Sequence, residues 1–362
     1  MTSDAAAQAL ASLLGIRLPI IQAPMAGISS PAMAAAVSNA GALGSISIGN
    51  LDIERAARAI TEVRALTTRP FNVNVFCHRP ARRDAELEAG WLDRLRPEFT
   101  RRGGVPPAAL AEPFQRFQDN RPLLDLLVAQ RIPVVSFHFG LPGREAIRAL
   151  RAAGSLLMAT ATNLSEARRV SDASVDVVIA QGIEAGGHRG LFQPDALDEG
   201  LGTMRLTRLL SIHIDLPIVA AGGLMDGAEI ALALRQGASA AQLGTAFLAT
   251  DESLATAAHR AALTNRRTVV TRALSGRPAR AIANKLTRLG EGVAAADIPD
   301  FPVAHDAARA LDTLASRRHE ADFGSHWAGR GAARVRAMPA ATLVAALADE
   351  LAAAGGVNAE RR

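Results

Sequence analysis

Residues 216–247, LPIVAAGGLMDGAEIALALRQGASAAQLGTAF, contain the pattern that decides the fold. An apolar run over 216–221 ends at two glycines, an Ala/Leu-rich stretch over 227–236 has apolar residues at helical spacing, and a second apolar run covers 240–247. Short apolar runs that alternate with longer amphipathic stretches are typical of strand–helix–strand units, which build parallel sheets. Asp226, directly before the amphipathic stretch, is a favourable residue for beginning a helix.

The same alternation runs through most of the chain. Six earlier apolar runs resemble strands, and they cover residues 20–25, 42–47, 71–76, 133–138, 155–161 and 175–181. Stretches with helical spacing separate the runs, and they cover residues 31–40, 53–66, 143–152, 165–171 and 203–212. Eight strands alternating with helices over about 250 residues predict an α/β fold of the (β/α)8 or TIM-barrel type. The active site of such a barrel lies in the loops after the carboxyl ends of the strands.

Two segments depart from the alternation and predict the domain organisation. Residues from about 78 to 131 form a helical insertion after the third strand, and residues 266–329 form a smaller, mainly helical second lobe. We expect the barrel to span residues 1–265 and to be completed by a C-terminal helix within 330–362. The amphipathic part of that last segment covers 339–354 and should pack back on the barrel.

Composition excludes several classes of protein. Hydrophobic residues make up 49% of the 362 residues and charged residues 21%, which is typical of a globular protein and not of a disordered one. No uncharged apolar stretch is long enough for a membrane span. The single cysteine, Cys77, excludes an internal disulfide and a cysteine-based metal site, so we expect a cytoplasmic protein without a metal. The net charge is +5, but the arginines are scattered and aromatics make up only 4%, so we expect no nucleic-acid partner.

Glycines end the last two predicted strands. Gly222 and Gly223 follow one strand, and Gly244 and Thr245 follow the next. Backbone N–H groups that no side chain covers bind phosphate well, and barrel phosphate sites recur after strands seven and eight. The alternative is that these glycines only make tight turns. The chain contains neither a P-loop nor a convincing G-x-G-x-x-G motif, so we expect any phosphate to bind at the barrel.

Seven segments together resemble the nitronate monooxygenases, formerly called 2-nitropropane dioxygenases. The segments are QAPMAGISSP (22–31), NVNVF (72–76), SFHFG (136–140), QGIEAGGHRG (181–190), IVAAGGLMDG (218–227), AQLGTAFLAT (241–250) and WAGRG (327–331). The EAGGHRG part is the most specific of them, and WAGRG has Arg330 where the family more often has glutamine. The resemblance implies an FMN-binding barrel with an extra helical lobe.

The resemblance also implies which residues contact FMN. It places a run of residues under the flavin ring, amides beside the ring or ribityl chain, and glycines where the backbone comes close to the ring or the phosphate. The residues implied are Gln22, Ala23, Pro24, Met25, Asn74, Gln181, Gly186, Gly187, Gly222, Gly223, Gln242, Leu243, Gly244 and Thr245. Amide side chains suit this role because they can hydrogen-bond flavin carbonyls and nitrogens without adding charge.

Two histidines in the predicted barrel mouth are candidates for catalysis. A histidine there can hydrogen-bond a nitronate anion or remove the α-proton of a nitroalkane. His188 lies in the glycine-rich loop, where it could alternatively cap a turn, and His138 lies between two phenylalanines, where it could be a packed structural residue. His78 is a weaker third candidate. Glu184 either accepts a hydrogen bond from His188 or Arg189, or is a solvated loop acid.

The function that the resemblance implies is FMN-dependent oxidation of alkyl nitronates with O2, giving a carbonyl compound and nitrite. Nitroalkanes are further candidate substrates, and we expect a monomer or a homodimer. An NAD(P)H-dependent FMN reductase of the enoyl- or quinone-reductase type is the alternative, because such enzymes share the AGGH-like loop. A barrel that binds a phosphate-bearing ligand without catalysis is the third interpretation.

Overall fold

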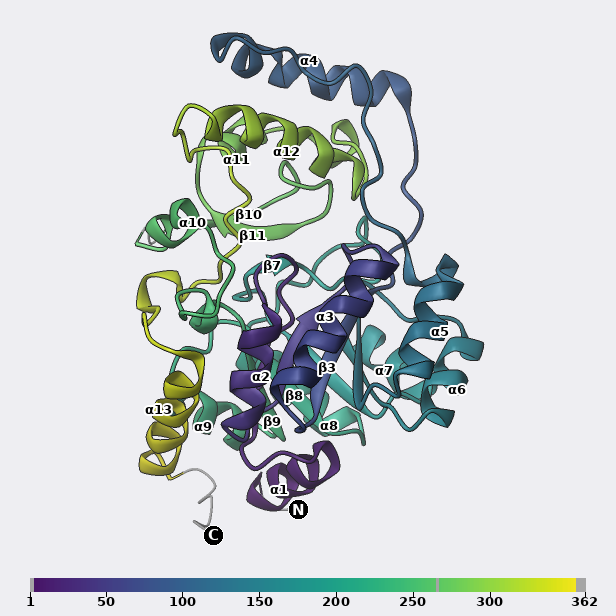
Figure 1. The fold of residues 1–362 in the computed structure, drawn as a ribbon, viewed down its shortest axis with the longest axis vertical. Coiled ribbons are helices and arrows are strands. Elements are labelled where there is room, and N and C mark those ends of the chain that lie inside the picture. Colours follow the sequence, from purple (N-terminus) through teal and green to yellow (C-terminus); the bar gives the residue numbers. More distant parts are fainter. Residues whose placement is uncertain (1–2, 265–266, 356–362) are drawn as a thin grey trace.

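Eight parallel strands form a closed barrel in the computed structural model, which describes residues 3–264 and 267–355 (Figure 1). Around the barrel the strands follow the order β1-β9-β8-β6-β5-β4-β3-β2. A parallel bridge between Ile21 and Leu43 joins β1 to the start of β2 and closes the ring. The barrel strands are β1 (Ile20–Gln22), β2 (Gly44–Ser47), β3 (Phe71–Phe76), β4 (Val134–His138), β5 (Leu156–Ala161), β6 (Val177–Gln181), β8 (Ile218–Ala221) and β9 (Ala240–Leu243).

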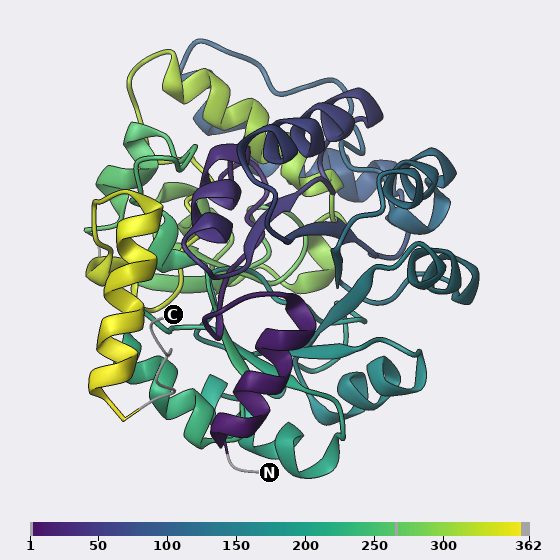
Figure 2. The same ribbon diagram turned by 60° about the horizontal axis from the view of Figure 1, so that its bottom comes forward.

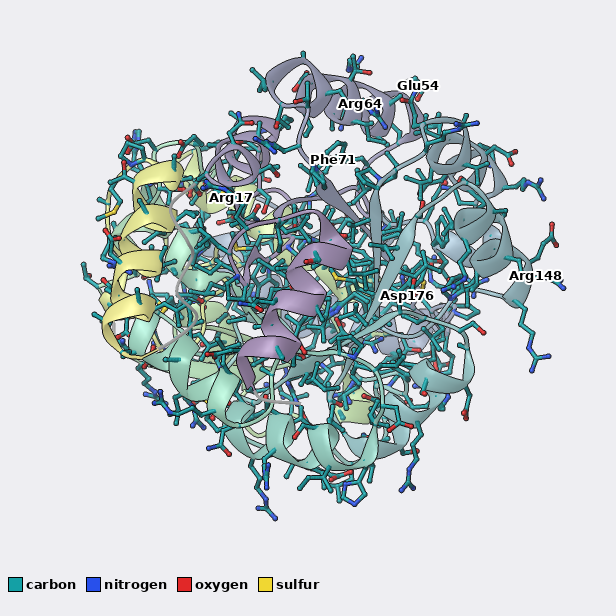
Figure 3. All side chains as sticks on the ribbon, turned by 90° about the horizontal axis from the view of Figure 1, so that it is seen from below. Arg17, Glu54, Arg64, Phe71, Arg148 and Asp176 are labelled. Atoms are coloured by element: carbon teal, nitrogen blue, oxygen red, sulfur yellow. The ribbon has the colours of Figure 1, made fainter. Side chains whose placement is uncertain are left out.

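The helices that cover the outside of the barrel lie between these strands (Figure 3). They are α2 (Pro31–Asn39), α3 (Ile53–Leu66), α5 (Arg121–Ala129), α6 (Arg144–Ala152), α7 (Leu164–Asp172), α8 (Thr203–His213) and α9 (Gly227–Arg235). Several begin at a side-chain cap that the sequence contains, such as Ser30 before α2, whose hydroxyl accepts from the Met33 N–H. Asp226 caps α9 in the same way through the Glu229 N–H.

The predicted (β/α)8 barrel is therefore confirmed, and all eight predicted strands are present. The first and the last end earlier than predicted, at Gln22 and Leu243. Pro24 has no N–H to continue a ladder. Beyond β9 the chain instead turns tightly as a short 3-10 helix, η2 (Thr245–Phe247), in which the Phe247 N–H donates to the Gly244 carbonyl.

Helix α1 (Ser3–Leu14), which was not predicted from the sequence, closes the amino-terminal end of the barrel (Figure 2). Leu10 and Leu14 pack there against interior residues such as Val134 and Val219. Because this end is filled with apolar side chains, an open site can exist only at the opposite, carboxyl end of the strands.

A second lobe lies over the carboxyl end of the barrel (Figure 1). Its elements are β10 (Thr268–Thr271), β11 (Ala279–Ile282), α11 (Lys285–Leu289), η3 (Ala295–Asp297), α12 (Val303–Ser316) and α10 (Ala257–Ala262) beside them. Helix α4 (Ala85–Arg101), from the insertion after β3, packs on α12 through Trp91, Leu95 and Phe99. The insertion thus extends the lobe, and it returns to the barrel through η1 (Phe117–Asp119).

The chain returns to the barrel through η4 (Ala332–Arg334) and α13 (Ala340–Ala353), which lies where the sequence predicts the C-terminal helix. Helix α13 packs against α9 and α2, and the Gly227 N–H donates to the Glu350 carboxylate at 2.8 Å. The domain boundary predicted at 265/266 and the end of the C-terminal segment, 356–362, lie outside the described residues. Among the helices that the structure describes, none is long and apolar enough to cross a membrane.

Packing of α13 gives a prediction about stability. Leu347 is fully buried among apolar residues of α9, α2 and β9, so Leu347→Ala should lower the free energy of unfolding by about 2–5 kcal/mol. The change is measured by urea unfolding followed by circular dichroism. Ile212→Ala is the control, because Ile212 is 59% exposed on α8 and its truncation should change stability by less than about 0.5 kcal/mol. Equal effects of the two substitutions would contradict this account.

Candidate active site

A cavity of about 400 Å³ lies between the carboxyl ends of the strands and the second lobe. Of the sequence-predicted site residues, the structure places fourteen in its lining: Ala23, Pro24, Met25, Asn74, His138, Gln181, Gly186, Gly187, His188, Gly222, Gly223, Gln242, Gly244 and Thr245. The lobe adds Phe301, His305, Ser325 and Trp327. The cavity is therefore a joint product of barrel and lobe.

Two predicted site residues, Gln22 and Leu243, do not line the cavity. The Gln22 amide donates to Ser29 Oγ at 2.8 Å and accepts from the Ser45 N–H at 2.8 Å, so it fixes the loop after β1. Leu243 is buried in the apolar layer between the barrel and its helices. Both residues support neighbours that do line the cavity.

Strand register brings polar side chains to one level at the cavity floor. Asn74 pairs with Ser136 across β3 and β4, and its amide donates to the Ser136 carbonyl and hydroxyl at 3.1 and 3.0 Å. Gln242 lies at the same end of β9, beside Ala221 of β8. Its Oε1 is buried and accepts no hydrogen bond from any described residue. A buried acceptor without a donor is free to accept a hydrogen bond from a bound group.

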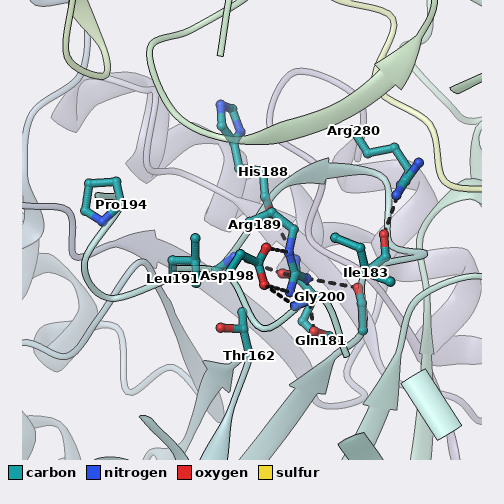
Figure 4. Close-up of polar contacts among 12 residues, drawn as sticks. Thr162, Gln181, Ile183, His188, Arg189, Leu191, Pro194, Asp198, Gly200 and Arg280 are labelled. Atoms are coloured by element: carbon teal, nitrogen blue, oxygen red, sulfur yellow. Dashed lines mark hydrogen bonds and ion pairs between the residues drawn. The ribbon is translucent and has the colours of Figure 1, made fainter. Parts of the chain in front are cut away.

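A buried arginine holds the glycine-rich loop after β6 (Figure 4). Arg189 is fully buried, and its Nη1 donates to the Gln181 carbonyl, the Gln181 side chain and the Gly182 carbonyl, each at 3.0 Å. Its other nitrogens donate to Asp198 at 2.7 and 3.1 Å. Although burial acts in the opposite direction, the hydrogen bond and charge of Arg189 lower the pKa of Asp198. The sequence contains Arg189 in the EAGGHRG segment, but nothing in the pattern indicated this anchoring role.

The residues before Arg189 connect this loop to the lobe. Strand β7 (Gly187–His188) pairs antiparallel with β11, with His188 opposite Ala279. Gly187 has a φ of +73°, which suits glycine, and a Cβ on Gly186 would lie 2.5 Å from the Gly329 nitrogen. The WAGRG segment therefore packs directly on EAGGHRG, which explains why both need glycine.

The glycine-lined end of the cavity is formed by β8 and β9. Gly222 and Gly223 have φ values of +124° and +73°, so they make a turn that other residues rarely adopt. Thr245 Oγ1 accepts from the Gly329 N–H at 2.9 Å, which ties this end to WAGRG. Glu184 contacts neither histidine nor Arg189: its carboxylate accepts from the Thr203 N–H and hydroxyl at 2.9 Å. The predicted hydrogen bond from His188 or Arg189 is therefore wrong, and Glu184 is a half-buried loop acid that holds Thr203.

His188 projects toward the lobe, on the opposite side of the chain from Arg189 (Figure 4). Its Nε2 lies 2.9 Å from Ser275 Oγ, whose hydroxyl is also 3.4 Å from the Arg277 carbonyl. If Ser275 donates to that carbonyl, it accepts from the His188 Nε2–H, and Nδ1 is left unprotonated. Nδ1 has no hydrogen-bond partner among the described residues, so it can accept a proton or a hydrogen bond from a bound molecule.

His138 has both ring nitrogens engaged by the protein. Nδ1 lies 3.0 Å from Thr160 Oγ1, and Nε2 lies 3.4 Å from the His188 carbonyl. Its ring packs against Phe139 at a centroid distance of 4.4 Å. His138 thus supports the loop that carries His188.

Sequence reasoning missed several residues in and beside the cavity. Phe301 and Trp327 pack on the His188 ring, with centroids at 5.2 and 4.9 Å, and His305 lines the cavity from α12. The WAGRG segment was a usable signal for Trp327, whereas Phe301 and His305 lie in the lobe far from any recognised motif. His78 is buried, and neither of its ring nitrogens has a hydrogen-bond partner among the described residues.

Burial keeps these imidazoles neutral. It is the main cause that lowers the pKa of His78 and of His138 to about 3, and the nearby Arg277 charge adds to it. Burial also holds the pKa of His188 well below its ordinary value of 6.5. No aspartate or glutamate of the described chain lines the cavity. The site thus presents neutral imidazoles, amides and backbone groups to a bound molecule.

Comparisons with known proteins agree with this geometry. The sequence profile of the nitronate monooxygenase family matches residues 7–350. A nitronate monooxygenase from Paraburkholderia phytofirmans is 51% identical over 354 residues, which are 97% of this chain and 97% of that protein. The structure of nitroalkane oxidase from Streptomyces ansochromogenes is 42% identical, with a TM-score of 0.87 over 96% of this chain and 99% of that one. FabK from Thermotoga maritima is 28% identical, with a TM-score of 0.72 over 95% and 96%.

Fold and site together define a (β/α)8-barrel enzyme whose cavity joins glycine-lined strand ends to buried histidines. The chain belongs to the nitronate monooxygenase family, whose members are flavin-dependent oxidoreductases. The resemblance noted in the sequence is confirmed.

The buried histidines predict how stability depends on pH. Their pKa values are lower in the folded protein than in the unfolded chain, so the unfolded state binds more protons below about pH 6.5. Stability should therefore be unaffected by histidines above pH 7 and should fall as the pH drops from about 6.5 toward 4. Each such histidine contributes at most about 1.4 kcal/mol per pH unit. Urea unfolding between pH 7.5 and 5 measures the slope.

Two variants test the assignment to buried histidines. His259 has a pKa lowered to about 4, mainly by burial, so His259→Asn should reduce the slope. The exposed His319 provides the control, because His319→Asn should leave the slope unchanged. A stability that is flat from pH 7.5 to 5 would contradict the neutral, buried cluster.

Proposed function

We propose that this protein oxidises alkyl nitronates with O2, giving a carbonyl compound and nitrite, with FMN as its flavin. Small nitronates and nitroalkanes are its partners in this proposal. The observation that supports it most directly is His188, which lies in the cavity with Nε2 held by Ser275 and Nδ1 available to a bound molecule. A cytoplasmic location and a monomeric or homodimeric state remain predictions from the sequence.

The residues of the cavity fit a flavin mononucleotide. Gln242 Oε1 is a buried acceptor with no donor among the described residues, and a flavin N–H would satisfy it. Gly223 and Gly244 would hold the phosphate with backbone N–H groups that no side chain covers, and Thr245, at the start of η2, would add its own N–H. Asn74 and Gln181 lie at the cavity floor, where their amides would flank the ring or ribityl chain. No nucleotide-binding half for an adenylate is present in the described chain, which favours FMN over FAD.

Catalysis would divide between the cofactor and the chain. When bound, FMN would supply the redox chemistry, which passes electrons from the substrate to O2. With Nδ1 unprotonated, His188 would take up the α-proton of a neutral nitroalkane. In the other tautomer, its Nε2 would accept from the Ser275 hydroxyl and its Nδ1–H would donate to a nitronate oxygen. Phe139, Phe301 and Trp327 surround His188 and would exclude water from the reacting atoms.

Anaerobic mixing distinguishes this proposal from the reductase alternative. The purified protein is mixed with a nitronate, and separately with NADPH, while the flavin spectrum is recorded. We expect the nitronate to change the spectrum and NADPH to leave it unchanged. Reduction by NADPH without any response to nitronate would favour the reductase, and a colourless protein would favour a barrel that only binds a ligand.

Gly244→Val tests the cofactor site. Gly244 has an ordinary φ of −106°, and a Cβ there would lie 3.4 Å from Ala23 Cβ, so the backbone tolerates a side chain. The valine would occupy the cavity, so we expect normal folding by circular dichroism but loss of most bound flavin by absorbance. Gly143→Val, at the start of α6 and outside the cavity, should retain flavin. Mass spectrometry of flavin released from the wild type should identify FMN, and FAD would contradict the proposal.

His188→Ala tests the catalytic residue. The variant should keep FMN but lose about 10²–10⁴-fold in turnover, which is typical for removal of one positioned acid–base group. If His188 removes the α-proton, the loss should be larger with neutral nitroalkane than with preformed nitronate. If it only holds the anion, both substrates should suffer alike, mostly in kcat/KM.

His138→Ala is the comparison. Because both ring nitrogens of His138 contact the protein, this substitution should lower the melting temperature. Its effect on turnover should be smaller than that of His188→Ala. The assignment would be wrong if His188→Ala kept near-normal turnover of nitronate while His138→Ala lost it.

A further inference from the structure

Arg277 is a buried charge with no ion pair among the residues that the structure describes, and it lies directly behind the active site. It is 1% exposed and lies just before β11. One of its nitrogens donates to the Leu191 carbonyl, but its Nε has no hydrogen-bond partner among the described residues. No ion pair to Arg277 occurs in the described chain, whereas the equally buried Arg189 is paired with Asp198. An unpaired buried charge is costly for folding and therefore calls for an explanation.

Phe139 lies between this charge and the histidines. The guanidinium carbon of Arg277 is 4.2 Å from the centre of the Phe139 ring. The same ring packs edge-on against His188 at 5.5 Å, and against His138 at 4.4 Å. Phe139 has a φ of +72°, an unfavourable conformation for a large residue, so the fold maintains strain to place this ring.

Several charged or titratable groups surround His188 and Arg277. The titratable or charged groups that influence His188 are His78, His138, His305 and Arg277, and those that influence Arg277 itself are Glu166, Asp195, Arg79 and Arg272. Glu166 already accepts from the Thr162 and Phe192 N–H groups. The three histidines act on His188 only when protonated, and burial keeps them neutral. Of the groups that influence His188, Arg277 is therefore the one that stays charged. Burial lowers its pKa to about 9, so it is still protonated at neutral pH.

We propose that Arg277 is a specificity-determining residue: its unpaired charge, acting across Phe139, makes the cavity prefer anionic nitronates over neutral nitroalkanes. This inference rests on the proposed function, because it concerns the substrate of that same site. Arg277 does not line the cavity and would not touch the substrate. Its influence is electrostatic, since one aromatic ring separates it from the reacting groups.

Coulomb's law gives the size of the effect. At an effective dielectric constant of about 20 and a separation on the order of 10 Å, a unit charge changes an equilibrium constant about tenfold. Loss of the positive charge should therefore weaken binding of a monovalent anion about tenfold. It should also raise the pKa of His188, because protonation would no longer be opposed by a neighbouring cation.

Arg277→Gln and Arg277→Met remove the charge in two ways, and Arg277→Lys keeps it. Glutamine retains an amide donor for the Leu191 carbonyl, while methionine retains apolar bulk against Phe139. Arg272→Met is the matched control: Arg272 lies on the same segment, but its charge is 3.8 Å from Asp195. Each FMN-loaded protein is assayed for kcat/KM with a nitronate and with its neutral nitroalkane across pH 6–9, and is titrated anaerobically with nitrite by flavin absorbance.

We expect the variants that lack the charge at position 277 to differ from those that keep it. The uncharged variants should lose about tenfold in kcat/KM for nitronate and in nitrite affinity but little for the neutral nitroalkane, and any acidic limb of the kcat/KM profile should move to higher pH. Arg277→Lys and Arg272→Met should stay close to the wild type. Equal losses on both substrates with an unchanged pH profile and unchanged nitrite affinity would overturn the inference, as would loss of the preference in Arg277→Lys.

Failure of the proposed function gives a different result. In that case the wild type itself does not turn over nitronate. The nitrite titration still tests Arg277, because it measures binding of an anion and requires no turnover. If one uncharged variant does not fold, the other provides the same comparison.

Discussion

Closure of the barrel is the constraint on which the rest of the structure depends. The bridge between Ile21 and Leu43 completes the ring of parallel strands, so every strand ends at the same rim. Helix α1 fills the opposite end with leucines. Segments far apart in the sequence, such as Asn74, Gln181 and Gln242, are thereby brought around one cavity.

The lobe completes the site because the glycine-rich loop after β6 is held from two sides. Arg189 fixes the loop to the barrel through Gln181 and Asp198, and β7 joins it to β11 of the lobe. His188 lies between these two attachments, with Ser275 of the lobe on its Nε2. The catalytic candidate is thus positioned on rigid elements, which precise acid–base chemistry requires.

The electrostatics of the cavity follow from the same arrangement. The lining contains neutral imidazoles and amides, and no carboxylate of the described chain faces it. Arg189, close to the cavity floor, is paired with Asp198, whereas Arg277 has no ion pair among the described residues and lies on the far side of Phe139. In our proposal, the positive charge of Arg277 attracts an anionic substrate without forming a direct ion pair with it. The substrate can then still react, and its products can leave.

The sequence by itself determined the eight strands, most of the helices and the side chains at the strand ends, because these depend on local periodicity and on parallel strands sharing one rim. Its limits show at particular residues. Gln22 lies in a recognised motif but bonds Ser29 and Ser45, and Glu184 bonds Thr203 instead of a histidine. Ser275, Arg277 and Phe301 reach the site only because the lobe folds over the barrel. Such contacts join residues about 90 or more positions from His188, and no local pattern records them, so only the tertiary structure decided them.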